Sequence, residues 1–168
     1  MIKQIYTDIQ TRLEAIKDAE NNFILTHFDL WNQQVNFIEE ETPFNTPAAF
    51  VEILPIQWQQ LSGGYQQAEV TIRLHLVTQW FAQTAKYNPK QSAALDYLDL
   101  PGKVFDAMHK FSIANSNQFV RVRSVVNHNH ERYVDSVEEY TGLVQVQAIQ
   151  GNYTEVNAKP KITEQETE

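Results

Sequence analysis

Residues 68 to 78 constrain the fold more than any other part of the chain. Apolar residues occupy every second position from Ala68 to Leu76, and polar or charged residues fill the positions between them. Successive side chains of a β-strand point to opposite faces, so this alternation predicts a strand with one buried and one solvated face. A strand of this kind needs a sheet whose apolar face is covered by other elements.

Four further segments have strand character. They are residues 23–32, 48–58, 120–126 and 137–149, of which the first is the weakest. About ten residues around Gly63 and Gly64 join the second of these segments to the strand at 68–78, which exceeds the turn of an ordinary hairpin. We therefore expect a long protruding β-hairpin.

Two segments have the signature of a helix. Apolar residues recur every three or four positions from Ile2 to Ile16, as on one face of an amphipathic helix. Asp99 and Pro101 mark a second helix start, as an N-cap and a first-turn proline, and Asn115 to Asn117 mark the end of that helix,. This order of elements predicts an α+β fold, a two-layer sandwich. It has a largely antiparallel sheet of four to five strands, with two helices packed on one face.

Composition limits both the organisation and the chemistry of the chain. With 168 residues, 42% of them apolar, we expect a single domain over residues 1–153,. Residues 154–168 are poor in apolar side chains and predict a disordered acidic tail. No apolar run approaches the roughly 20 residues of a membrane span, so we expect a cytoplasmic protein without a membrane partner. The absence of cysteine excludes disulfides, thiolate nucleophiles and zinc–thiolate sites,.

The sequence contains no complete catalytic constellation. No serine lies in a nucleophile elbow, and Gly63-Gly64 lacks the context of a phosphate-binding loop,. His128 and His130 have the spacing at which two strand residues can share a metal, but no pattern supplies a third ligand. A polar hairpin end is the simpler interpretation of that pair. We therefore predict no enzyme activity and no cofactor.

Large aromatic residues gather at the ends of the predicted hairpin. They are Trp58, Tyr65, Trp80 and Phe81. Aromatic side chains at loop ends are typical of protein interfaces, where Trp and Tyr anchor partners. Packing in the core is an equally good interpretation of the four.

Arginines on the predicted strands are the second set of interface candidates. Strand alternation points Arg121 and Arg123 to the same face, where together with Arg73 they would form a basic stripe,. Pairing with glutamates of neighbouring strands is the preferred interpretation. The glutamates in question are Glu69, Glu138 or Glu139. A net charge of −8 also disfavours nucleic-acid binding,.

Several segments resemble the tail terminator, or tail completion, proteins of long-tailed bacteriophages. The resemblance begins with Phe-Asp-Leu-Trp-Asn-Gln-Gln at 28–34 and continues through Glu39–Glu41 and residues 43–52. Residues 73–78 and 98–100, and the order of the elements up to about residue 150, extend it over nearly the whole chain.

This resemblance implies an α+β subunit of a homo-hexameric ring that caps the tail tube and meets the head connector. It places the protein in the virion, after assembly in the cytoplasm of the bacterial host. The hairpin of residues 48–80 would then project toward neighbouring subunits. DNA would pass without specific binding through a lumen lined with carboxylates.

Two hypotheses from other classes stay open beside this one. A small-ligand or metal-binding module would use the exposed sheet face, with His75, His128 and His130. An enzyme of unknown type is the third.

Overall fold

A mixed sheet of six strands forms the centre of the molecule. The computed structural model describes residues 1–35, 44–79, 84–127 and 132–147. The strands are β1 (His27–Leu30), β2 (Ala48–Ile53), β3 (Gln59–Gln60), β4 (Tyr65–Gln79), β5 (Val120–Asn127) and β6 (Tyr133–Gln147). They are ordered β1-β2-β4-β6-β5, with β3 paired to β4. The β1/β2 pair is parallel and the other pairs are antiparallel.

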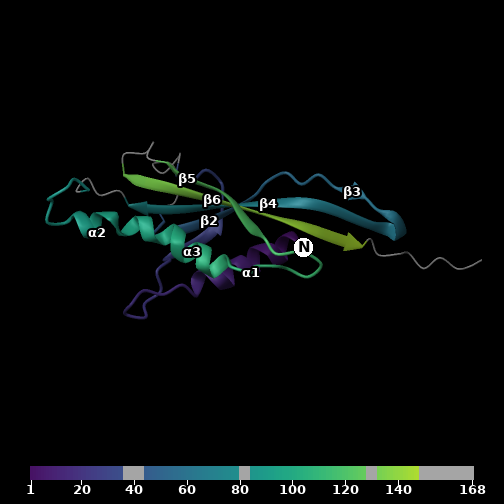
Figure 1. The fold of residues 1–168 in the computed structure, drawn as a ribbon, viewed down its shortest axis with the longest axis horizontal. Coiled ribbons are helices and arrows are strands. Elements are labelled where there is room, and N and C mark those ends of the chain that lie inside the picture. The colour runs from purple at the N-terminus through teal and green to yellow at the C-terminus, as the bar shows by residue number, and fades with distance from the viewer. Residues whose placement is uncertain (36–43, 80–83, 128–131, 148–168) are drawn as a thin grey trace, which may run out of the picture.

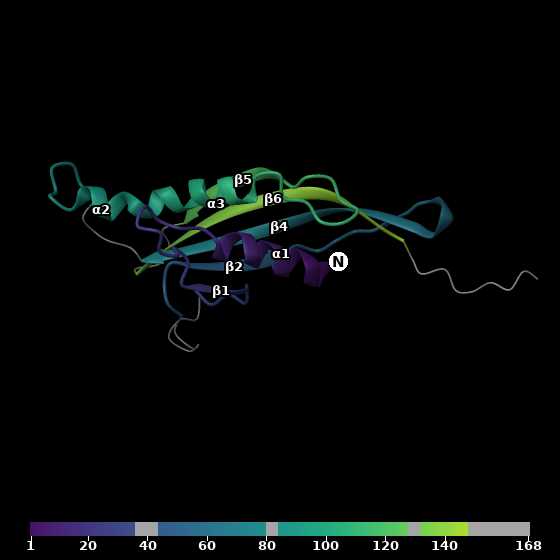
Figure 2. The same cartoon turned by 90° about the horizontal axis from the view of Figure 1, so that it is seen from below.

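The helices cover one face of this sheet (Figures 1 and 2). They are α1 (Ile2–Glu14), the short α2 (Gln91–Leu95) and α3 (Leu100–Met108), with a 3-10 turn at Asp96–Asp99 between the last two. The Arg12 guanidinium of α1 donates a hydrogen bond of 3.0 Å to the Ala107 carbonyl of α3. The predicted α+β class, with two helices packed on a largely antiparallel sheet, is therefore confirmed. No helix in the described ranges is long and apolar enough to cross a membrane.

Apolar residues at the predicted spacings build the main core between sheet and helices. The stripe of α1 buries Ile5, Ile9 and Leu13, and the even-numbered positions of β4 from Val70 to Leu76 point at the helices and are fully buried. Val104 and Met108 of α3 close the core from above the sheet. The alternation at 68–78 thus identified the buried face of the central strand correctly.

The β4/β6 pair is longer than the sequence predicts. Fifteen residues of each strand pair without interruption, from Tyr65 opposite Gln147 to Gln79 opposite Tyr133. Beyond the helices the pair continues as a projection that we call the arm, made of residues 54–68 and 143–147; Figure 1 shows its tip with β3 beside it. Glutamines replace the apolar alternation there, so the pattern underestimates β4.

The start and end of the second helix differ from the prediction. Asp99 has helical backbone angles (φ −78°, ψ −25°), and its side chain makes no capping hydrogen bond. It cannot act as the predicted cap, because the 3-10 turn at 96–99 already leads the chain into α3. The helix ends at Met108 rather than near residues 115–117. The predicted tail at 154–168 lies outside the described residues.

Gly142 of β6 is a position where the fold requires the absence of a side chain. A Cβ atom there would lie 2.9 Å from the ring of Phe119, which is itself buried. We predict that Gly142→Ala lowers the free energy of unfolding by about 1–3 kcal/mol, because the buried ring has to shift.

Gly102 on α3 provides the matched control, since a Cβ there would have no atom within 4 Å. Gly102→Ala should be neutral or stabilise by about 0.5–1 kcal/mol, as expected for Gly→Ala within a helix. Urea denaturation of both variants measures the difference. Equal stabilities would show that Phe119 does not pack on Gly142 as described.

Candidate functional site

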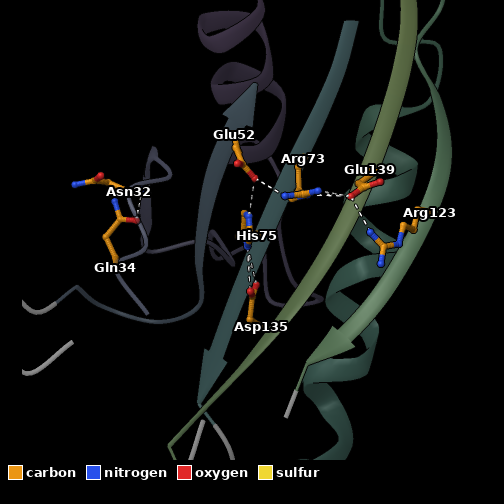
Figure 3. Close-up of polar contacts among 8 residues, drawn as sticks. All are labelled: Asn32, Gln34, Glu52, Arg73, His75, Arg123, Asp135 and Glu139. Carbon is orange, nitrogen blue, oxygen red and sulfur yellow. Dashed lines mark hydrogen bonds and ion pairs between the residues drawn. The ribbon is translucent and has the colours of Figure 1, made fainter. Parts of the chain in front are cut away.

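The face of the sheet opposite the helices, which we call the helix-free face, carries a row of charged residues on β2, β4, β6 and β5 (Figure 3). We call it the polar band. It consists of Glu52 on β2, Arg73 and His75 on β4, Asp135 and Glu139 on β6, and Arg123 on β5. On β2, β4 and β6 these positions alternate with buried residues of the opposite face. The register of the strands pairs Glu52 with Arg73 and Arg73 with Glu139. It also pairs Glu139 with Arg123 of β5.

Arg73 is the central residue of the polar band. Its Nη1 lies 2.8 Å from Glu52 Oε2 and its Nη2 lies 2.9 Å from Glu139 Oε1, while Nε donates a second hydrogen bond to Glu139. Burial lowers the pKa of Arg73, but the hydrogen bonds and charges of Glu139 and Glu52 outweigh burial and hold that pKa above its usual value,. The permanently charged guanidinium therefore links β2, β4 and β6 through their side chains.

His75 lies beside Arg73 but is not on a solvated surface, contrary to the alternation pattern. Only 6% of the residue is exposed. Its Nδ1 is 3.0 Å from Asp135 Oδ2, and its Nε2 is 3.4 Å from Glu52 Oε2. The indole of Trp31 stacks on the imidazole, with ring centroids 3.6 Å apart and an interplanar angle of 1°.

A second, smaller core explains why His75 is buried. The chain after β1 crosses the helix-free face, and Val35 packs there on Phe50 and Val77, with Trp31 and Phe44 at the margin. Phe44 meets Phe50 edge-on, at 4.9 Å between ring centroids. Part of the face predicted to be wet is therefore covered by chain that the sequence pattern assigned to a weak strand and a loop.

The two arginines of β5 point to opposite faces, so the predicted basic stripe is wrong. A β-bulge between Arg121 and Arg123 shifts the register by one residue, and a shift of one residue reverses the face of a strand side chain. Arg123 pairs with Glu139 at 3.3 Å on the helix-free face. Arg121 pairs with Glu138 at 3.3 Å on the helix side. The preferred interpretation of pairing with Glu138 or Glu139 is thus confirmed.

The environment of Arg121 also includes Phe105 of α3. The Arg121 guanidinium lies 4.1 Å from the centre of the Phe105 ring, which is partly exposed rather than in the core. Glu138 is buried and additionally accepts a 2.6 Å hydrogen bond from Ser124 Oγ. Arg121 therefore joins the outermost strand to α3 and is committed to contacts within the chain.

Of the remaining candidate residues, two lie on the arm and four lie outside the residues that the structure describes. Trp58 and Tyr65 lie on the arm and are 37% and 41% exposed. Trp80, Phe81, His128 and His130 lie outside the described residues. Sequence reasoning missed one signal on the arm, which is that no charged residue occurs from Ile53 to Ala68.

Glutamine side chains join the strands of the arm in place of ion pairs. Gln145 Nε2 donates to Gln67 Oε1 at 2.9 Å, and Gln66 Nε2 donates to Gln60 Oε1 at 3.2 Å. The arm is therefore a three-stranded ribbon held by backbone and amide hydrogen bonds.

Three hollows offer space for a small ligand, and two of them contain buried polar groups. One is a shallow depression of about 720 Å³ beside the polar band, lined by Arg73, His75, Arg123 and Asp135. The other, of about 470 Å³, lies near Thr78, whose buried hydroxyl has no hydrogen-bond partner among the residues that the structure describes. In the part of the chain that the structure describes, no group of three or more His, Cys, Asp or Glu is arranged to hold a metal.

The charged residues of the polar band satisfy one another, and this determines what the band can do. Arg73 and Arg123 pair with Glu52 and Glu139 within 3.3 Å, and the His75 ring nitrogens lie within 3.4 Å of Asp135 and Glu52. Ion pairs of this kind hold strands in register and exclude mispaired arrangements of the sheet. The geometry therefore favours a structural role for the polar band.

Comparison with known proteins adds no relative. The chain matches no protein-family model, and no curated protein matches it.

Replacing Arg73 tests the structural role of the polar band. We predict that Arg73→Met lowers the free energy of unfolding by about 1–3 kcal/mol at neutral pH, because two half-buried carboxylates lose their shared partner. Arg123→Met removes a more exposed partner of Glu139 and should cost at most about 1 kcal/mol. Chemical denaturation measures both losses.

An equal loss for both at neutral pH would contradict the central role of Arg73.

Proposed function

We propose that the chain is a tail terminator of a phage or prophage, a structural virion protein that acts through surfaces. Its homo-hexameric ring would terminate the tail tube and join it to the head connector. The resemblance of residues 28–52 and 73–78 to tail terminator proteins motivates the proposal, and the α+β fold agrees with what that resemblance implies.

The arm is the observation that carries the proposal best. The tip of the arm runs past the helices (Figure 1), while Val144 at its base belongs to the main core and Ile56 and Val146 pack against that core. Trp58 and Tyr65 nevertheless stay exposed on the arm, and exposed aromatic residues suit contact with other subunits. A projection of this kind is suited to contact with the neighbouring subunits of a ring.

The acidic charge of the chain fits passage of DNA through a ring. A net charge of −8 gives a field that repels phosphate, so a carboxylate-lined lumen would let DNA pass without specific binding. The partners of the ring would be copies of the chain, the tail tube and the head connector. Its place would be the virion, after assembly in the bacterial cytoplasm.

A small-ligand module is the second candidate function. The depression beside the polar band favours it, because Arg73 and Arg123 line a hollow of about 720 Å³. Against it, both guanidiniums already bind carboxylates of the chain. A ligand would have to displace these ion pairs.

Removing the gene from the phage or prophage that carries it tests the proposed function. We predict heads and tails that accumulate unjoined, with infectivity reduced by several orders of magnitude, because the joint between them is missing. Purified full-length protein added to such a lysate should restore infectivity. Electron microscopy of the restored particles should show a six-fold ring at the head-proximal end of the tail.

Gly102→Ala protein, altered on α3 and outside the arm, is the matched positive control and should restore infectivity equally. Joined, infectious virions formed without the gene would contradict the proposal.

A further inference from the structure

The arm differs from the rest of this acidic protein in charge. Neither residues 53–68 nor residues 140–147 contain a charged side chain, although the whole chain carries −8. The surface of the arm consists of glutamines together with exposed apolar residues, namely Trp58, Leu61, Tyr65 and Leu143. It combines an apolar contact surface with amide hydrogen-bonding groups, as the buried centres of protein interfaces do.

The outer edge of β5 is a second surface without net negative charge. Among the described residues β5 pairs only with β6, so the backbone groups on its other side have no strand partner. Val120 and Val122 are 56% and 55% exposed, and Val126 is 43% exposed. The strand contains no carboxylate, and its two arginines are neutralised by the glutamates of β6.

An open strand edge with exposed valines tends to pair with another chain. Natural sheets usually protect such an edge with lysine, proline or a covering segment. In β5 the bulge between Arg121 and Arg123 interrupts only the first half of the strand. The second half, from Arg123 to Val126, follows regular register, and its outer edge pairs with no other strand among the described residues.

We infer that the arm of one copy docks along the β5 edge of a second copy of this chain. This rests on the self-association in the proposed function and identifies the two surfaces that carry it. The distribution of charge is the reason for choosing a second copy of the chain as the partner at the β5 edge. Two chains of −8 repel each other, and the arm and the β5 edge are surfaces through which they can meet without opposing carboxylates.

The contact joins two different surfaces, so it is heterologous. Each copy still offers a free arm on one side and a free β5 edge on the other. Repetition of a heterologous contact gives a closed ring or an open filament. A ring therefore follows from this contact when its rotation closes.

Single cysteines test the contact directly, because the natural chain contains none. One protein carries Tyr65→Cys on the arm and a second, differing in size by a tag, carries Val122→Cys on β5. Within one chain these sites cannot bond. They lie at least seven residues apart along β6, which is roughly 23 Å at 3.3 Å per residue, whereas a disulfide needs Cα atoms within about 7 Å.

We expect mild oxidation of the mixture to give the arm–β5 product at least about tenfold faster than either same-site product, since docking raises the effective concentration of the two thiols. Tyr87→Cys, at an exposed position before α2, is the matched control and should cross-link slowly with both. Circular dichroism checks that each variant is folded. Arm–arm or control products formed as fast as arm–β5 products would overturn the inference.

The double variant Tyr65→Cys/Val122→Cys separates this inference from the proposed function. A ladder of cross-linked species that ends at a closed hexamer supports both. A ladder that grows past six through arm–β5 bonds supports the inference and contradicts the ring. A hexamer seen by light scattering without any arm–β5 bond overturns the inference and leaves the proposed function standing.

Discussion

The pairing of β4 with β6 is the interaction on which the rest of the structure depends. Fifteen consecutive residues of each strand face one another without a break, and every other strand attaches to one of these two or, through β2, to β4. One half of the pair supports the core under α1 and α3. The other half leaves the core as the arm, so a single continuous ladder connects the stable part of the molecule to its projecting surface.

Charge at the middle of the sheet is tolerated because the polar band is internally balanced. Arg73 bridges two carboxylates on neighbouring strands, and Trp31 covers the adjacent His75. Similar bonding on the opposite face ties Arg121 to Glu138 and Phe105. Side chains that would suit binding or catalysis in isolation here stabilise strand order, which leaves the arm and the edge of β5 as the surfaces suited to a partner.

Much of the fold was predictable because burial imposes periodicity. The alternation at 68–78 and the stripe from Ile2 to Ile16 located the core. Three features were not predictable: the β-bulge that separates Arg121 from Arg123, the cover that Trp31 places over His75, and the strand extension through Gln66 and Gln67. Each depends on contacts between segments distant in sequence or on backbone pairing without an apolar pattern. Local periodicity records neither.

Hydrogen–deuterium exchange tests the central claim, that the arm and β5 are the surfaces covered on assembly. It would compare the free chain with the assembled particle. Peptides covering residues 54–69 and 120–127 should exchange more slowly after assembly, because their exposed backbone gains partners. Peptides of α1 should be unchanged. Slower exchange confined to α1 and α3, with the arm unaltered, would contradict the account.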